Sequence, residues 1–212
     1  MLVYPSLDYE LNTQVRIHRE ANGYTQEEFA FLIGRDVADI VKYEDLTTTD
    51  AYDFNHINRY ARVLRRVPKD FVFEVSLLEN DIKIEARKTE YKTKTTYRGE
   101  RQLTIDGKPQ WVKLEPYSIP NDNITIEPND LARMVVLLDK LLIEGYFRDG
   151  VTGYDLFVHV GTLWSGGFCA KLLIEGLAVL SGRRKRPKLL PMRKAPKTEE
   201  KWILYKEDLK GH

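Results

Sequence analysis

The feature of this sequence that most constrains its fold is a pair of short helical segments, residues 26–33 and 37–43, joined through a single glycine. Thr25 is suited to be the N-cap of the first segment, and Glu28, three residues further on, completes a capping box. Gly34 can end that segment because glycine adopts a left-handed backbone conformation at little steric cost. Two short helices separated by such a turn form a helix-turn-helix, which is the arrangement that we predict here.

Helical spacing separates the buried from the exposed positions of this pair. In the first segment Phe29, Ala30 and Ile33 lie on one side, and Ala30 is small, as a close crossing of two helices requires. The second segment, for which Asp36 is a candidate N-cap, buries Ile40 and Tyr43 in the same way. Together with Leu64 further along the chain, Ala30 and Ile40 are therefore expected to be buried.

The segment is similar to the Cro/CI type of phage-repressor helix-turn-helix domain, and the resemblance extends over residues 11–75. The positions at the family's spacing are Val15, Arg19, Gly23, Thr25, Gln26, Phe29, Ala30, Gly34, Ile40 and Glu44. Ile57, Tyr60, Ala61 and Leu64 match a fourth helix, and residues 67–71 match a fifth. The resemblance implies a domain of five helices in which the third is the recognition helix for DNA.

The resemblance also implies roles for individual residues. Arg19 of the first helix and Glu44 at the end of the third would form a buried structural ion pair. Gln26, at the start of the second helix, would contact a phosphate. The base-facing positions of the recognition helix are occupied by Val37, Ala38 and Lys42, with Val41 beside them.

The charge of this region departs from what DNA binding favours. Four carboxylates lie in or beside the recognition helix, against the single cation Lys42; they belong to Asp36, Asp39, Glu44 and Asp45. Residues 1–76 contain nine Lys/Arg and thirteen Asp/Glu. Because affinity for DNA depends largely on neutralised phosphates, two functions stay open. One is a sequence-specific transcriptional regulator that binds double-stranded DNA as a homodimer. The other is an antitoxin-like or phage-related factor that binds a protein partner through the same fold.

The rest of the chain is expected to form two further regions, a β-rich connecting segment at 77–127 and a helical region at 128–212. In the connecting segment, Asp106-Gly107 between apolar positions predicts a β-hairpin. In the last region, helices are expected to start at Pro128, at Thr152 and near Phe168, followed by strands at 189–193 and 202–205. That order fits a winged helix, and a small helical bundle with a basic tail is the alternative. The predicted fold class is mainly α.

The last 32 residues are strongly basic, with eleven Lys/Arg against four Asp/Glu between Ser181 and His212. The densest run comprises Arg183, Arg184, Lys185 and Arg186. Such a run attracts phosphate, so it is a second candidate for DNA binding. A solvated tail that carries charge for solubility is the equally open alternative.

Several classes of function are not indicated by the sequence. Four scattered histidines and the single Cys169 do not have the spacing of metal ligands. The glycine-rich segment 161–167 lacks the Gly-Lys-Ser/Thr of a phosphate-binding loop. We therefore expect no enzyme activity, no metal and no cofactor. We also expect no membrane span, because charged residues interrupt the most apolar stretch, 131–147. One cysteine fits a cytoplasmic location.

Overall fold

The computed structural model describes residues 1–71, 80–121, 124–185, 187–192 and 204–208. Its contacts divide the chain into two compact units. The first unit comprises residues 1–23 and 38–123, and the second comprises residues 24–37 and 124–212.

The two helices of the predicted helix-turn-helix have the expected bounds, α2 at Gln26–Ile33 and α3 at Val37–Tyr43. The capping box is present: Thr25 Oγ1 accepts from the Glu28 backbone N–H at 3.1 Å, and the Glu28 carboxylate accepts from the Thr25 N–H at 3.0 Å. Gly34 ends α2 in the left-handed region, with φ of 67°. The two helices are divided between the units, since α2 belongs to the second and α3, from Ala38 on, to the first.

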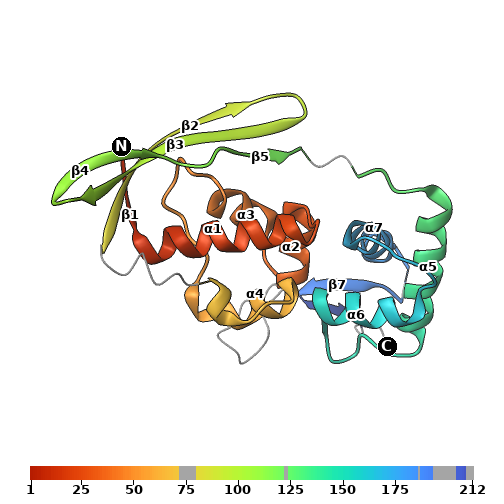
Figure 1. The fold of residues 1–212 in the computed structure, drawn as a ribbon. Coiled ribbons are helices and arrows are strands. Elements are labelled where there is room, and N and C mark those ends of the chain that lie inside the picture. Colours follow the sequence, from red (N-terminus) through yellow and green to blue (C-terminus); the bar gives the residue numbers. More distant parts are fainter. Residues whose placement is uncertain (72–79, 122–123, 186, 193–203, 209–212) are drawn as a thin grey trace. The chain divides into compact units, whose positions relative to one another are not determined.

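The first unit contains the other helices of the N-terminal region (Figure 1). They are α1 (Ser6–Ala21), α4 (Ile57–Leu64) and two 3-10 turns, η1 (Phe54–His56) and η2 (Pro68–Phe71). The helices α1 and α4 contact each other, and both contact η2. Their apolar sides are buried, as are Ala30, Ile40 and Leu64, which the sequence predicted.

A five-stranded antiparallel sheet completes the first unit. Its strands are β1 (Leu2–Pro5), β2 (Asp81–Glu90), β3 (Lys94–Ile105), β4 (Lys108–Lys113) and β5 (Tyr117–Pro120). The order is β1-β2-β3-β4, and β5 pairs with the first four residues of β3. Tyr4, Ile82 and Ile84 form a buried cluster on one side of the sheet, and Tyr97 and Ile119 are also buried.

The β3–β4 hairpin turns at Asp106-Gly107, as the sequence predicted. Asp106 has φ of 51° and Gly107 has φ of 72°. Two successive residues with positive φ give a turn whose twist matches that of the flanking strands. The local sequence was sufficient to place this turn because aspartate and glycine tolerate that conformation.

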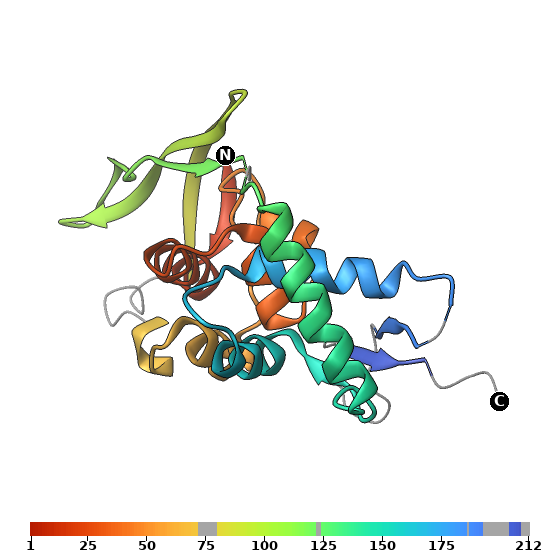
Figure 2. The ribbon, with the colours of Figure 1, turned by 90° about the vertical axis from the view of Figure 1, so that its right-hand side faces the viewer.

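The second unit contains α2, three further helices and a three-stranded antiparallel sheet of order β6-β8-β7. The elements are α5 (Pro128–Ile143), β6 (Val151–Thr152), α6 (Gly153–Leu163), α7 (Ala170–Ser181), β7 (Leu189–Met192) and β8 (Leu204–Glu207). The helix α5 packs on α7 (Figure 2). The helix α2 packs against both α6 and α7. Residues 193 and 202–203 of the expected strands lie outside the described ranges.

Gly153, the first residue of α6, is packed directly against α2. A Cβ added there would overlap the carbonyl oxygen of Phe31. Because that atom is backbone and cannot rotate away, Gly153→Ala is expected to lower the free energy of unfolding by about 1–3 kcal/mol. Gly161→Ala in the same helix is the matched control, since its added Cβ meets only Phe168 at 3.9 Å. It is expected to be neutral or stabilising by up to about 1 kcal/mol. Urea denaturation measures both, and equal effects would contradict the packing described.

The mainly α fold class expected from the sequence is wrong. The described residues form seven α-helices but also eight strands in two sheets, so the fold is mixed α and β. The strands that the sequence did not reveal are short, and their partners are distant. Leu2–Pro5 pairs with residues 81–84, and Val151–Thr152 pairs with residues 204–205. A two- to four-residue strand carries too little alternation to be detected without its partner.

Candidate nucleic-acid interface

One side of α3 is open to solvent, and it carries the residues that were expected to face DNA. Val37 is 44% exposed and Val41 is 38% exposed, and Ala38 and Lys42 are also exposed. Ile40, on the other side, is fully buried. The helical period separates the two sets, so the phase predicted for this helix agrees with the structure. The exposed side therefore offers three small apolar groups and one cation.

A buried ion pair fixes the end of α3 to α1. The guanidinium of Arg19 donates two hydrogen bonds to the Glu44 carboxylate, from Nε to Oε1 and from Nη2 to Oε2, each at 2.7 Å. Both residues are buried, at 3% and 2% exposure. Such a bidentate pair is directional, so it fixes the rotation of the helix end as well as its position. Arg19 and Glu44 thus lie together as the resemblance implies.

Tyr52 adds a third member to this cluster. Its hydroxyl donates to Glu44 Oε1 at 3.2 Å. Burial, and then the charge of Glu44, raise the pKa of Tyr52 well above its ordinary value, so the phenol stays protonated and remains a donor. Burial alone would lower the pKa of Arg19, but the hydrogen bonds and charge of Glu44 more than offset this and raise it. Arg19 therefore stays charged and Tyr52 stays neutral throughout the physiological pH range.

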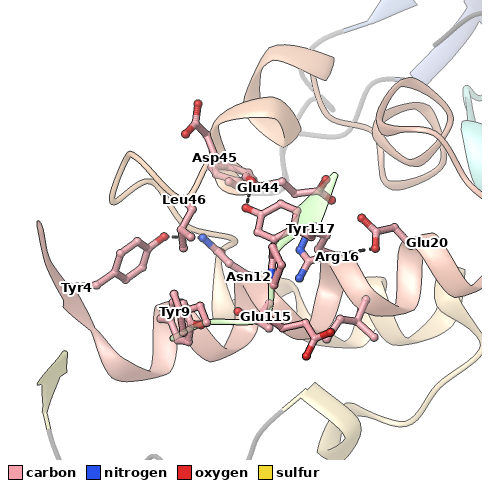
Figure 3. Close-up of a pocket in the computed structure, with 15 residues that line it drawn as sticks. Tyr4, Tyr9, Asn12, Arg16, Glu20, Glu44, Asp45, Leu46, Glu115 and Tyr117 are labelled. Carbon is pink, nitrogen blue, oxygen red and sulfur yellow. Dashed lines mark hydrogen bonds and ion pairs between the residues drawn. The ribbon is translucent and has the colours of Figure 1, made fainter. Parts of the chain in front are cut away.

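The hydrogen bond of Tyr117 fixes the same end of α3 to the sheet (Figure 3). Its hydroxyl donates to the Glu44 carbonyl oxygen at 2.6 Å. The guanidinium of Arg16 lies over the Tyr117 ring, 3.7 Å from its centroid. Arg16 also forms an ion pair with Glu20 at 3.1 Å. These residues line a cavity of about 340 Å³ between α1, the end of α3 and the segment before β5. The contacts of its tyrosine and arginine side chains link α1, the end of α3 and β5 to one another.

Ion pairs neutralise Glu44 and Asp45, two of the carboxylates near α3. Glu44 pairs with Arg19, and Asp45 pairs with Lys88 Nζ of β2 at 3.2 Å. Asp36 is exposed and Asp39 is half-buried. The repulsion that these acids exert on a phosphate is therefore weaker than a count of charges suggests. Neither Lys88 nor Tyr117 was found from the sequence, because each lies more than 40 residues from the helix that it supports.

The structure does not bring all the predicted DNA-facing residues into one unit. Gln26 is the first residue of α2, is half-buried, and belongs to the second unit. Its neighbour Glu27 pairs with Lys171 of α7 at 2.6 Å. The start of α2 is therefore engaged by α7 rather than being an isolated helix end.

The cations of the basic segment after α7 differ in whether they form an ion pair. Arg183 Nη1 pairs with Asp139 of α5, so its charge is taken up within the second unit. Arg184 and Lys185 are exposed, and neither forms an ion pair with another described residue. Arg186 lies outside the described ranges. The chain beyond this segment forms β7 and β8 and buries Leu189, so the expectation of a plain solvated tail does not fit residues 189–192 and 204–207.

Comparison with known proteins does not extend this description. No protein-family model matches the chain, and no significant match was found among curated proteins or solved structures. Among the described residues, no helix has the length and apolar character needed to cross a membrane.

Proposed function

We propose that this protein is a sequence-specific regulator that binds double-stranded DNA through the exposed side of α3. The observation that carries the proposal is that this side is exposed while contacts on the other side fix the C-terminal end of the helix. Arg19 and Tyr117 fix its end from two different elements. A recognition helix requires such fixing, since base contacts depend on where each side chain reaches in the groove.

The chemistry of the exposed side supports a particular form of recognition. Val37, Ala38 and Val41 are suited to contact thymine methyl groups, and Lys42 can donate to guanine O6 or N7. This set gives few phosphate contacts, so we expect the helix to supply base preference and other cations to supply affinity. Arg184 and Lys185 are candidates for the second role. A single helix of this kind reads only a half-site, which is why we propose a homodimer.

A protein partner is the second candidate function, and a specific observation favours it. Val37 and Val41 lie one turn apart on α3 and both are more than a third exposed, beside the carboxylates of Asp36 and Asp39. An apolar stripe with acidic edges is also a surface that a basic protein segment could bind. DNA binding would then be absent rather than weak.

Selection of binding sites from random duplexes tests the proposal. Wild-type protein is expected to enrich a short motif, and Lys42→Ala is expected to lose about 1–3 kcal/mol of discrimination at one base position of it. Lys108→Ala, which removes a charge at the β3–β4 turn, is the control and should enrich the wild-type motif. Enrichment of no motif by the wild-type protein would favour the protein-partner function.

A further inference from the structure

Four exposed cations gather at one end of the sheet in the first unit, on the β2–β3 hairpin. They are Arg87 of β2, Lys92 in the turn, and Lys94 and Arg98 of β3, and we call them the basic strip. The antiparallel register places Arg87 directly opposite Arg98. Directly opposite residues project from the same side of a sheet, and Lys94 lies on that side because it is four residues from Arg98.

The cations of the basic strip are close to two carboxylates, those of Glu85 and Glu100, but make no direct ion pair with them. None of the four cations forms an ion pair with another described residue. Like charges directly opposite each other on neighbouring strands destabilise a sheet. Arg87 and Arg98 therefore repel each other directly, and an anionic partner would bridge them. The next opposed pair, Glu85 and Glu100, ends the strip.

Three side-chain hydroxyl groups lie on the same side of the sheet as Arg87 and Arg98. Thr89 lies opposite Thr96, which lies opposite Ser118 of β5, so the three share the side of the sheet that carries Arg87 and Arg98. The hydroxyls of Thr96 and Ser118 are 2.9 Å apart. Arginine, lysine, serine and threonine side chains are the groups that proteins use to bind phosphate oxygens of DNA.

The turn at the tip of the hairpin is held in place by Asn121. Its side-chain amide donates to the carbonyl oxygens of Tyr91 and Lys92 at 3.1 and 2.9 Å. Its backbone N–H donates to the Thr93 carbonyl oxygen at 2.9 Å. The backbone that carries Lys92 is therefore fixed before any partner binds, which lowers the entropy lost on binding.

The opposite side of the same hairpin is attached to the end of α3. Lys88 pairs with Asp45, and Tyr97 of β3 stacks on Tyr117, whose hydroxyl reaches the Glu44 carbonyl oxygen. The hairpin and α3 therefore belong to one continuous body of contacts within the first unit. Arg87 and Arg98 project from the other side of this hairpin, and Lys92 lies in the turn at its tip.

We propose that the basic strip, on the side of the sheet that faces away from α3, binds the phosphate backbone of DNA and so supplies cations that α3 lacks. This inference rests on the proposed function of α3. In this proposal α3 determines which bases are preferred, and the strip adds affinity that does not depend on the DNA sequence.

The test is the salt dependence of binding to a random duplex, measured by fluorescence anisotropy with the full chain. In Arg87→Gln/Arg98→Gln, two phosphate contacts are lost. The slope of log K against log salt is expected to fall by about 1.8, and affinity at 0.1 M salt by up to about 60-fold. The melting temperature should stay the same or rise, since the like-charge pair is removed. Lys92→Gln/Lys94→Gln at the tip should also lower the slope, and it disturbs no paired strand position of β2.

The control is Lys108→Gln, which removes an exposed charge at the other end of the same sheet. β3 spans twelve residues, so the Lys108 end lies about 40 Å from the Lys94 end. The control should keep the wild-type slope. A slope equal in the arginine, tip and control variants would overturn the basic strip while leaving α3 as the binding element. Absence of binding by the wild-type protein at low salt would instead overturn both proposals.

Discussion

Replacing Arg19 by methionine is expected to lower the free energy of unfolding by about 3–5 kcal/mol, because the change leaves the buried Glu44 carboxylate without its cation. The substitution removes the two hydrogen bonds that Arg19 donates to the Glu44 carboxylate, while the Tyr52 hydroxyl still donates to it. Urea denaturation followed by circular dichroism measures the loss. Arg19→Met/Glu44→Leu should recover much of it, since removal of both charges leaves no unpaired ion in the core.

An exposed ion pair provides the control for this experiment. Lys140 Nζ of α5 lies 3.8 Å from Oε1 of Glu144, the C-cap residue of this helix, and the two side chains are 70% and 54% exposed. Lys140→Met is expected to change the free energy of unfolding by less than about 1 kcal/mol. If Arg19→Met cost no more than Lys140→Met, the Arg19–Glu44 pair would not be what fixes the end of α3.

Replacing Glu28 by alanine is expected to destabilise the protein by about 2–4 kcal/mol, because one buried carboxylate serves two helices. Its two oxygens accept from the Thr25 N–H, in the capping box of α2, and from the Lys171 N–H in the first turn of α7, each at 3.0 Å. Glu28 is 2% exposed, so water does not replace it readily. The cap residue of α7, Cys169, makes no side-chain capping hydrogen bond, so Glu28 takes that role.

Two variants separate the role of Glu28 from that of charge alone. Glu28→Gln keeps one acceptor and should cost about half as much as alanine. Glu27→Ala removes the neighbouring carboxylate, whose pair with Lys171 Nζ is partly exposed, and should cost less than about 1 kcal/mol. Faster amide exchange in the first turn of α7 is expected for Glu28→Ala only. Unchanged exchange there would show that Glu28 does not cap α7.

The elements that the sequence predicted correctly are those whose signals are local. The box of Thr25 and Glu28 and the left-handed Gly34 fix α2 within ten residues. In the same way Pro128 begins α5, and Thr152 caps α6 by accepting from the Asp155 N–H. These groups satisfy backbone donors of their own helix, so their identity indicates a boundary without knowledge of the rest of the chain.

Features that depend on distant partners could not be predicted in this way. The second role of Glu28 requires Lys171, which is 143 residues away. The compensation of Asp45 requires Lys88, and the sheet requires β1 to pair with β2 across most of the first unit. The charge count around α3 was right, but it could not show which carboxylates are already paired. Only the contacts between distant segments show that.

The measurement that tests the role of α3 most directly is protection of guanine N7 from methylation in a duplex selected by the protein. N7 faces the major groove, where a recognition helix would lie. Wild-type protein is expected to protect N7 atoms within one major-groove segment of each half-site, and Lys42→Ala is expected to expose one of them again. Full reactivity of every N7 with the duplex saturated by protein, or no binding at low salt, would contradict DNA recognition by α3.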